Sequence, residues 1–578
     1  MDHFVSTFNQ IMEVINGVLW HDAALYAILG IGILFTFWSG FCQYRALTHG
    51  VAITLGKYDD PDDPGAINHF QALSTALSAT VGIGNIGGVA TAVALGGPGA
   101  VFWMWIVGLI GMALKTTEVT LAMLYRNTDD PDNPHGGAMW VADKGFRQMG
   151  PKWAPVGKAI ASLFCVTLLI ATITGGNMFQ AFNVAEVTSK DVPQIQYLIN
   201  SWTGGSQLVN ARLLTGVLLA VLAALVIIGG IKRIGQVAGA LVPFMCGLYL
   251  LLACYVLFVH FNDIPTIFAS IVRSAFASTE AQGAFLGGTI GSAFSYGMQR
   301  ALFSNEAGQG SAPIAHSAAK TDEPVREGLV AGLEPFIDTL VVCTMTALVI
   351  LASGAWNREP IASFASTPDL KSAGDGKWIP DTIELPQKTS KEAWQEGESI
   401  FVIVESTSHG ERRRLTGTVH RRDQNRLAID WDVFDSADKP RLVSADVFNN
   451  YLGAALTSHA FNRVVPGMGS WIVLLAVWLF AFSTVISWNY YGEQGILYLF
   501  GERSILPYRV FYCVCIVVAC TGLIRTEREL NNLTNIGTGV MLFANLPICL
   551  IFGKQTMNAY HDYLRRLKAG EVTDRRGS

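Results

Sequence analysis

Long apolar segments alternate with short polar ones along most of the chain. Segments of about twenty residues, the length that a helix needs to cross the hydrocarbon core of a bilayer, recur about eleven times, at 23–42, 70–96, 99–125, 156–184, 211–230, 234–260, 281–300, 328–354, 467–490, 507–524 and 532–552. This pattern predicts an all-α polytopic membrane protein with about eleven transmembrane helices.

The composition agrees with a protein that lies in a lipid bilayer. Of the 578 residues, 51% are hydrophobic and 15% are charged, against about 25% charged residues in soluble domains. The nine cysteines lie in or beside apolar segments without the spacing of metal ligands, so we interpret them as packing residues. We expect the lipid bilayer as a partner and no nucleic acid. The N-terminal residues lack a basic region and a cleavage site, so we predict no removable signal peptide.

The distribution of basic residues predicts an orientation. If the N-terminus lies outside, the loops on the cytoplasmic side carry most of the Lys and Arg, with Arg300, Lys320 and Arg326 counted in one of them, and the loops on the other side carry few. Under the positive-inside rule, the N-terminus is therefore expected outside and the C-terminus in the cytoplasm. The predicted location is the cell (inner or plasma) membrane.

A polar, charged, proline-containing segment at 355–447 does not fit a bilayer. Its runs 399–405, 414–420 and 426–431 are typical of short strands, with turns expected at Gly410 and 423–425. We therefore predict four parts: a transmembrane core that begins at 1–354, a β-rich extracytoplasmic insertion at 355–447, the rest of the core at 448–553, and a cytoplasmic tail at 554–578.

The insertion contains a basic cluster, residues 412–414 with Arg421 and Arg422. Such a cluster is suited to anionic lipid headgroups or polysaccharide, which makes a cell-envelope partner one interpretation. A run of charges is also typical of a solvated surface with no partner, and both interpretations stay open.

Glycines interrupt the second apolar segment. Residues 81–88 read VGIGNIGG, and each glycine inside a helix costs about 1 kcal/mol, so we expect no continuous helix. A broken helix in a bilayer is tolerated only where protein or a watery cavity satisfies the freed backbone groups. This favours a binding site near the membrane midplane. Close helix packing on small residues is the alternative, but it gives no reason for the polar Asn85.

A second interruption is predicted at 281–300. Its small and polar residues are Gly287, Gly288, Thr289, Gly291, Ser292, Ser295 and Gly297. Without the first span, the remaining ten divide into five plus five, and each half opens with a glycine-broken helix. This arrangement is typical of inverted-repeat transporters, in which the free N–H groups of half-helices face an anionic group of the substrate.

Four stretches carry a family resemblance. They read TVGIGNIGGVATAVALGGPGAVFWMW, ALFSNEAGQGSAPIAHSAAKTDEPVREG, DTLVVCTMTALVIL and LFAFSTVISWNYYGE, and they resemble the alanine/glycine:cation symporter family over nearly all of the membrane part. The resemblance implies a LeuT-like 5+5 inverted-repeat bundle with one extra N-terminal helix. It also implies uptake of small neutral amino acids, such as L-alanine and glycine, driven by Na⁺ or in some members by H⁺. The segment at 355–447 departs from the family pattern, and no organic cofactor is expected.

The resemblance also implies site residues in the first broken helix. Residues 80–85 are similar to the unwound segment of LeuT-fold symporters, so the backbone of Gly82 and Gly84 would bind the substrate carboxylate, with Thr80 and Asn85 nearby. Gln180, on the span that crosses the bundle, is a candidate substrate contact, with helix packing as the alternative.

The resemblance also implies a sodium site beside the same break, between the broken span and the span that contains residues 480–484. Its expected ligands are the carbonyls of Ser78 and Val81, the hydroxyls of Ser483 and Thr484, and the carbonyl of Phe480. The two hydroxyls alternatively bond to carbonyls one turn earlier in their own helix.

Other candidates concern the amino group and the side chain of the substrate. Trp488 would cap the side chain and limit its size, unless it belongs to an interfacial belt. The candidates that face the amino group lie in the second interruption: Gly288, Thr289, Gly291 and Ser292.

Charged groups inside spans are functional candidates by default. Glu118 has Lys115 one helical step away, and a pair between them is the simplest account. Asp338 is a candidate gate or proton-coupling group. Asn305 and Glu306, in the polar segment 304–308, suit either a cytoplasmic gate or a continuation of the unwound region.

The function that these patterns favour is sodium-coupled symport of a small amino acid. The alternatives are a proton-coupled or differently selective amino-acid transporter and, from a different class, a solute sensor that does not transport. A channel would need a repeated selectivity loop or a ring of charges, and an enzyme would need a nucleophile with its base or a metal cluster. Neither pattern is present in the sequence, so we do not expect an enzyme.

Overall fold

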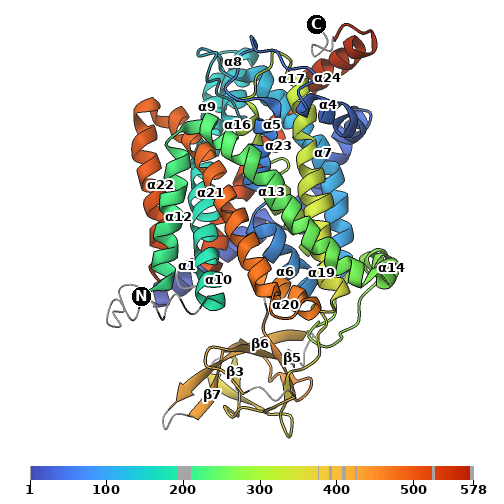
Figure 1. Ribbon diagram of the computed structural model, residues 1–578, viewed down its shortest axis with the longest axis vertical. Helices are drawn as coiled ribbons and strands as arrows, with labels where there is room; N and C mark the ends of the chain where they lie inside the picture. The colour runs from blue at the N-terminus through green and yellow to red at the C-terminus, as the bar shows by residue number, and fades with distance from the viewer. Residues whose placement is uncertain are drawn as a thin grey trace.

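The computed structural model describes residues 2–572 except 193, 195, 196, 198, 200–209, 375, 390–392, 407–411, 423–425, 452 and 524–526. A bundle of long helices forms most of the molecule, and a small β-sheet unit covers one end of it (Figure 1). We call this end the sheet end and the opposite one, where the C-terminus lies, the C-terminal end. The turns predicted at Gly410 and 423–425 lie outside the described residues.

Helices fill the first half of the chain. Those before residue 280 are α1 Asp2–Leu19, α2 Asp22–Trp38, α3 Cys42–Arg45, α4 Val51–Thr54, α5 His69–Thr80, α6 Val89–Gly96, α7 Gly99–Tyr125, α8 Ala138–Met149, α9 Ala154–Ile173, α10 Gln180–Asp191, α12 Ala211–Ile227, α13 Gly230–Val259 and α14 Ile264–Phe276. Turns of π-helix lie between some of them: η1 Ala46–Gly50, η2 Gly84–Gly88 and η3 Thr174–Phe179.

The second half contains the remaining helices and the strands of the described residues. Its helices are α15 Ile290–Asn305, α16 Ala312–His316, α17 Pro324–Ala331, α18 Leu333–Pro335, the π-helical η5 Phe336–Cys343, α19 Thr344–Ala352, α20 Ala454–Val464, α21 Gly469–Phe500, α22 Ile505–Ala519, α23 Glu527–Ile551 and α24 Gly553–Lys568. Short 3-10 turns, η4 Phe261–Asp263 and η7 Glu502–Ser504, precede α14 and α22.

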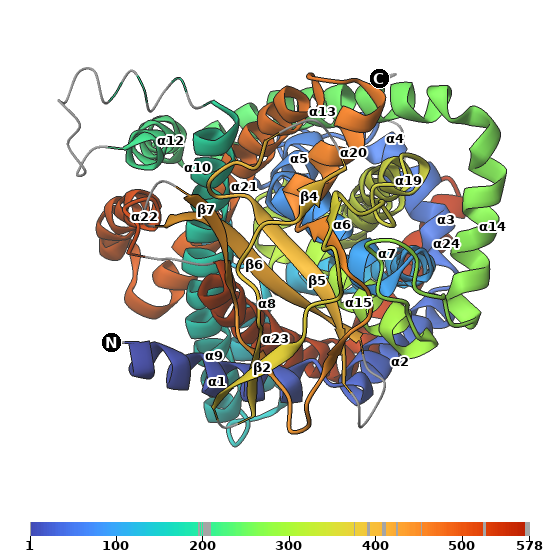
Figure 2. The same ribbon diagram turned by 90° about the horizontal axis from the view of Figure 1, so that it is seen from below.

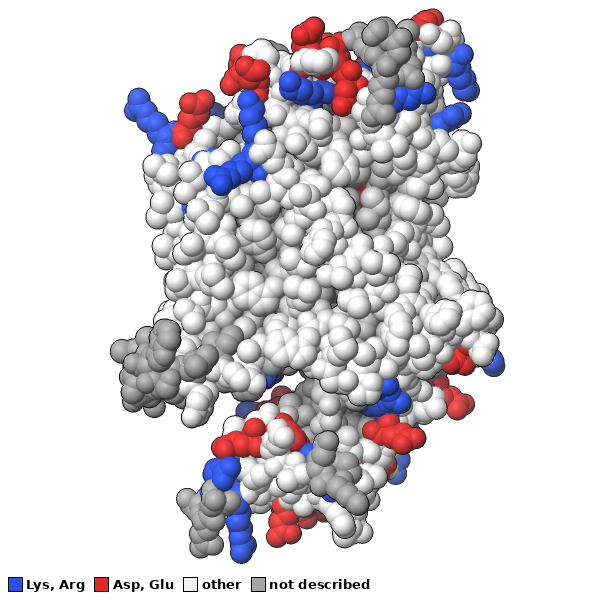
Figure 3. Space-filling model, viewed as in Figure 1, with Lys and Arg blue, Asp and Glu red and all other residues white. Residues whose placement is uncertain are grey.

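The bundle has the lengths and the surface of a membrane protein. Seven helical stretches among the described residues are long and apolar enough to cross a bilayer, or up to eight if α5 and η2–α6 form one bent span. In Figure 3, charged side chains gather at the two ends and leave a broad uncharged band between them. The predicted polytopic helical architecture is confirmed, while the number of eleven spans stays a prediction.

The strands predicted in the polar segment are present. They are β1 Ala362–Ser363, β2 Leu370–Gly374, β3 Lys377–Pro380, β4 Gln387–Lys388, β5 Ser399–Glu405, β6 Arg412–Arg422, β7 Arg426–Trp431, β8 Phe434–Asp435, β9 Arg441–Leu442 and β10 Asp446–Asn449. One antiparallel sheet has the order β4-β1-β10-β5-β6-β7 with β9 on β5, and a smaller sheet has the order β2-β3-β8. The chain as a whole is therefore not all-α.

An apolar contact joins the larger sheet to the bundle. Ala284 and Leu286, in the loop before α15, pack on Phe401 of β5 and Phe448 of β10. Figure 2 shows β5 and β6 crossing the end of the bundle. The sheet therefore lies directly on the loop that leads into α15.

Most of the basic cluster in this unit has partners within the unit. Arg412 pairs with Glu405 (3.3 Å), Arg421 with Glu396 (3.1 Å) and Arg422 with Asp430. The side chain of Arg414 stacks on the ring of Phe401 instead, 4.6 Å from its centroid. These contacts favour the interpretation of the cluster as a surface neutralised by neighbouring acids.

The first predicted break is present. Helix α5 ends at Thr80, and the axis changes direction by 53° before η2–α6. Asn85 contributes to the break because its Oδ1 accepts a hydrogen bond from the N–H of Gly82 (2.9 Å). Glycine and a backbone-binding amide thus make this interruption together, as the sequence predicts.

The second predicted break is wrong in position. Helix α15 runs without interruption from Ile290 to Asn305, through Gly291 and Gly297. At Gly297 the helix crosses α7 so closely that a Cβ atom would lie 2.4 Å from the carbonyl of Ala100. The glycine permits close packing, the alternative named above for the first interruption.

The polar residues of that segment form the start of the helix. Thr289 is the N-cap of α15, and its side chain and that of Ser292 bond each other's backbone N–H groups in a capping box (3.0 and 2.9 Å). Thr289 and Gly291 are exposed. Arg300, counted above with a basic loop, lies inside the helix, which corrects that count.

Candidate functional site

The backbone around residue 81 approaches two other helices closely. At Gly82, an added Cβ would lie 2.8 Å from Oγ1 of Thr484 on α21, and at Gly84 it would lie 2.2 Å from Nη2 of Arg300 on α15. Only glycine allows side chains from both neighbours to reach the broken backbone. The break is therefore a meeting point of three helices.

The second interruption follows α15 instead of dividing it. Glu306 adopts a left-handed conformation (φ 53°), and Gly308 and Gly310 follow with φ of 83° and 77°. A residue other than glycine seldom adopts such a φ, and it often marks a functional site when it does. The side chain of Ser311 donates to Oε2 of Glu306 (2.5 Å). The helix thus ends at Asn305, and the backbone from Glu306 onward is irregular, while the two interpretations of the polar segment 304–308 stay open.

A small cavity lies between these two breaks. Its volume is about 40 Å³, which leaves space for only a few water-sized groups. It is lined by Ala79, Thr80, Gly82, Gly84, Gly175, Gln180, Arg300, Phe303, Glu306, Gln309, Thr484, Trp488, Thr534 and Thr538. The structure therefore brings seven of the candidates together here: Thr80, Gly82, Gly84, Gln180, Glu306, Thr484 and Trp488. We call this space the central cavity.

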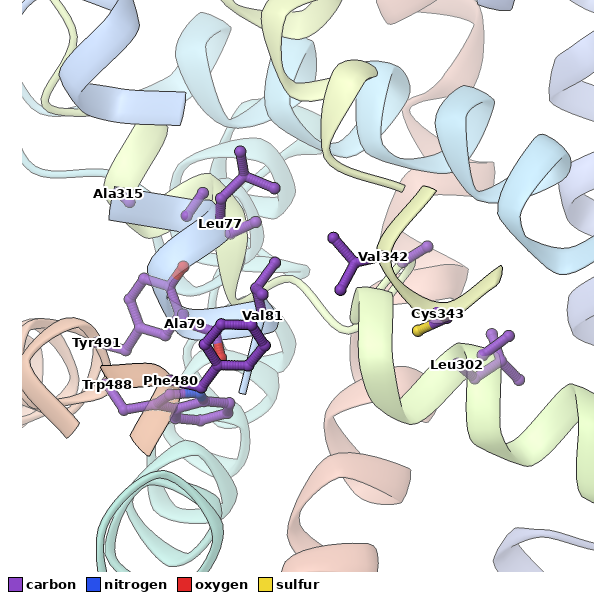
Figure 4. Close-up of a cluster of buried hydrophobic side chains, with 14 of the residues drawn as sticks. Leu77, Ala79, Val81, Leu302, Ala315, Val342, Cys343, Phe480, Trp488 and Tyr491 are labelled. Carbon is purple, nitrogen blue, oxygen red and sulfur yellow. The ribbon is translucent and has the colours of Figure 1, made fainter. Parts of the chain in front are cut away.

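Trp488 forms one wall of the central cavity. Its Nε1 donates to the carbonyl of Ala79 (3.2 Å), and the residue is only 5% exposed, so it does not belong to an interfacial belt. Figure 4 shows Trp488 near Ala79, whose carbonyl it contacts. Its place is possible because residue 176 is glycine, where a Cβ would lie 2.3 Å from the indole ring.

A larger cavity, the vestibule, adjoins the central one. Its volume is about 490 Å³, and its walls come from α1, α6, α10, α15 and α23. Three residues line both cavities: Gly84, Arg300 and Phe303. Helix α1, which the sequence did not predict as a separate element, is held on α23 by hydrogen bonds from Asn16 to the carbonyl of Asn532 and from Trp20 to that of Asn535 (3.0 and 3.1 Å).

The expected sodium ligands lie together beside the break. Oγ of Ser483 and Oγ1 of Thr484 both donate to the carbonyl of Phe480 (2.8 and 3.0 Å). Oγ of Ser78 donates to the carbonyl of Ser483 (2.6 Å), and Val81 is fully buried close by. The back-bonding named above as the alternative is therefore present, and each hydroxyl oxygen keeps lone pairs with which to accept. We call these oxygens the hydroxyl–carbonyl cluster.

Asn85 and Asp338 face each other one layer behind the cavity. Nδ2 of Asn85 donates to Oδ1 of Asp338 (2.5 Å), and the hydroxyls of Ser304 and Thr339 donate to Oδ2 (2.8 and 2.9 Å). Asn305 donates to Thr339 (3.1 Å). Three donors thus hold the buried carboxylate, which ties the first break to the end of α15.

Four candidates lie away from both cavities. Gly288, Thr289, Gly291 and Ser292 are at the start of α15, near the sheet, and none lines the central cavity or the vestibule. The glycines of this segment, which we interpreted as a break, lie in the loop before α15 and in the contact between α15 and α7. We therefore leave these four residues out of the site.

A continuous chain of ionic groups joins the second break to the C-terminal end. We call it the buried ionic chain, and it consists of Asp59, His69, Glu327, His316, Glu334, Lys115 and Glu118. Asp59 is 43% exposed, whereas the other side chains are at most 1% exposed. The pair of Glu118 and Lys115 expected from the sequence is part of a much longer arrangement.

The contacts along this chain connect five helices. His316 of α16 lies between Glu327 of α17 (2.5 Å) and Glu334 of α18 (2.6 Å). On α7, Nζ of Lys115 lies 3.3 Å from Glu334 and 3.8 Å from Glu118. Oε2 of Glu118 accepts from the N–H of Gly310 at the second break (3.1 Å), and His69 of α5 contacts Glu327. The chain binds both broken helices to α7 on the C-terminal side.

Several lining residues escaped the sequence analysis. Arg300, Phe303 and Gln309 lie around the end of α15, and Thr534 and Thr538 lie one turn apart on α23. The segment ALFSNEAGQGS indicated polarity there, but the misplaced break directed attention to the other end of the helix. Arg300 itself could have been found as a lone charge in an apolar stretch.

Comparisons with known proteins agree with this geometry. A family model described as the sodium:alanine symporter family matches residues 5–384 and 442–576. The sodium/alanine symporter AgcS of Methanococcus maripaludis is 33% identical over 93% of each chain. The putative sodium/proton-dependent alanine carrier protein YrbD of Bacillus subtilis is 32% identical over 96% of this chain and 92% of its own. The probable sodium/glutamine symporter GlnT of the same organism is 29% identical over 97% and 92%.

Proposed function

Because the chain belongs to the sodium:alanine symporter family, a family of transporters and not of enzymes, we propose that it imports small neutral amino acids, L-alanine and glycine, together with Na⁺. The observation that carries this proposal is the central cavity. It lies between the break that follows α5 and the irregular backbone that follows α15, and it touches the hydroxyl–carbonyl cluster through Thr484. Substrate and ion would then share one wall.

The size and lining of the central cavity support a small substrate. Its volume of about 40 Å³ is bounded by the ring of Trp488, which leaves little room for a side chain. Gly82 and Gly84 carry no side chain of their own, so a substrate carboxylate can approach the broken backbone at Gly84, while the N–H of Gly82 already donates to Oδ1 of Asn85 (2.9 Å). Thr80 and Gln180 add polar atoms, and Oε1 of Gln180 is buried without a hydrogen-bond partner among the described residues.

Sodium is the proposed coupling ion. Hard cations prefer oxygen ligands, and the hydroxyls of Ser483 and Thr484 with the carbonyls of Ser78, Val81 and Phe480 supply neutral oxygens at one spot. In this role the ion is cargo that moves with the amino acid.

Alternating access is the proposed mechanism, in a LeuT-like 5+5 bundle with one extra N-terminal helix. The vestibule would be the entry from outside, while the buried ionic chain would hold the cytoplasmic side closed. The N-terminus and the sheets would then lie outside and the C-terminus in the cytoplasm of a cell with this protein in its inner or plasma membrane. We also propose that the sheet unit is an insertion with a role at the cell envelope.

A second candidate is proton coupling or a different amino acid. Asp338 and Glu306 are buried carboxylates beside the site, and the names of two relatives mention protons and glutamine. A solute sensor is the candidate from another class, with the sheet unit as the reporter of occupancy.

Uptake of radiolabelled L-alanine and glycine into proteoliposomes tests the proposal. We expect accumulation driven by an inward Na⁺ gradient and none when choline replaces Na⁺. Accumulation that ignores Na⁺ and follows a pH gradient would assign the coupling to protons. Folded protein that accumulates neither amino acid under either gradient would contradict symport of these substrates.

The wall formed by Trp488 predicts a strong effect of Gly176→Ala. The new methyl group would lie 2.3 to 2.6 Å from atoms of the tryptophan, so the indole must move into the central cavity. We expect alanine uptake at least tenfold below the unchanged protein, measured at matched protein levels in the same vesicles.

Gly247→Ala is the matched control for that change. Residue 247 lies in α13 with no heavy atom within 4 Å of an added Cβ, and alanine favours a helix over glycine by about 1 kcal/mol. Uptake should be unchanged. Equal alanine uptake by Gly176→Ala and Gly247→Ala would show that transport does not depend on the position of Trp488.

A further inference from the structure

Arg300 is fixed against the first broken helix. Added Cβ atoms at Gly84 and Gly88 would lie 2.2 Å from its Nη2 and 1.9 Å from its Nη1, so the guanidinium rests directly on bare backbone. The ring of Phe303 covers its other side, with the guanidinium carbon 4.9 Å from the ring centroid. This packing holds the group at the junction of the vestibule and the central cavity, both of which it lines.

The guanidinium lacks a counterion. Its Nε and Nη2 are buried and have no hydrogen-bond partner in the described part of the chain, where no carboxylate lies within 4 Å of it. The buried carboxylates near it have other partners: Asp338 accepts from Asn85, Ser304 and Thr339, and Glu306 accepts from Ser311. Arg300 as a whole is partly exposed toward the vestibule, but a buried donor without a partner costs free energy, so an anion that reaches Nε and Nη2 would be stabilised there.

We propose that Arg300 binds the carboxylate of the transported amino acid where the vestibule meets the central cavity. The inference deepens the proposed function and rests on it. A guanidinium offers a planar fork of N–H donors that matches a carboxylate. It adjoins the backbone of Gly84, so the fork and the N–H groups of the break approach the same carboxylate.

The charges of the central cavity match a zwitterion. Arg300 supplies a cation and Glu306 an acid, and both line the same space of about 40 Å³. An amino acid carries the complementary pair, with its carboxylate for Arg300 and its ammonium group for Glu306. The arrangement selects against solutes that carry only one of the two charges.

Equilibrium binding of radiolabelled L-alanine to purified protein in Na⁺ tests this role, with L-alaninamide, which lacks the carboxylate, as the competitor. For unchanged protein we expect alanine to bind far more tightly than the amide. In Arg300→Gln we expect alanine to bind about 10- to 100-fold more weakly, the loss of a charge-assisted hydrogen bond. The affinity for the amide should not change, so the discrimination between the two is lost.

Arg300→Lys and Arg273→Gln complete the comparison. Lysine keeps the positive charge without the planar fork, so Arg300→Lys should bind alanine more tightly than Arg300→Gln and more weakly than the unchanged protein. If Arg300→Gln does not fold, Arg300→Lys replaces it in the test. Arg273, exposed on α14, is a control whose removal should leave both affinities unchanged. Melting temperatures without substrate identify a merely structural effect.

The outcomes separate the two proposals. If unchanged protein binds alanine and Arg300→Gln binds it equally well, the role of Arg300 is overturned and the proposed function stands. If Arg300→Gln weakens alanine and alaninamide equally, the residue shapes the cavity and does not bind the carboxylate. If unchanged protein binds neither alanine nor glycine, the proposed function and this inference fall together.

Discussion

Replacing Ser483 and Thr484 together by alanine is expected to abolish sodium-driven uptake. Each hydroxyl donates to the carbonyl of Phe480 and keeps lone pairs for a cation. Removing two such ligands should weaken Na⁺ affinity about 100-fold or more. The measurement is the Na⁺ concentration that gives half-maximal alanine uptake in proteoliposomes.

Thr521→Ala is the control for that double change. Thr521 makes the same kind of bond, from its hydroxyl to the carbonyl of Val518 (2.8 Å), at an exposed helix end outside the site. It should leave the Na⁺ dependence as it is. An unchanged Na⁺ dependence in the double variant would mean that the hydroxyls of Ser483 and Thr484 only bond their own helix.

Glu334→Ala is expected to produce the largest loss of stability. Glu334 contacts both His316 (2.6 Å) and Lys115 (3.3 Å), and all three side chains are fully buried. Removing one partner of a buried ion pair leaves uncompensated charge and costs about 3–5 kcal/mol. We expect a clearly lower melting temperature in detergent and, because the broken helices lose their common anchor, impaired closure of the cytoplasmic side.

A surface pair provides the comparison. Glu323 pairs with Arg566 at 2.8 Å, but these side chains are 25% and 31% exposed, and such pairs contribute about 0–1 kcal/mol. Glu323→Ala should therefore lower the melting temperature little. Equal shifts in the two variants would show that the buried ionic chain does not hold the helices together.

Local sequence was a good guide to the first break and a poor one to the second. At 81–88 the glycines and Asn85 act on their own backbone, so the pattern alone predicts the interruption. At 281–300 the glycines act on a neighbour: Gly297 makes room for the backbone of α7. Nothing within the segment distinguishes these two uses of glycine, so the break was assigned to the wrong end of α15.

The sequence by itself determined the features whose causes are local. Apolar segments of bilayer length, the polar segment with its strands and the broken backbone at residue 81 all follow from the cost of burying or freeing nearby groups. The tertiary structure alone decided which distant residues meet. Arg300 lies on Gly84, and His69 lies on Glu327, because helix packing brings together residues that are far apart in the chain. The contacts that neutralise buried charge, and the guanidinium of Arg300 that forms no ion pair among the described residues, therefore became visible only in the folded bundle.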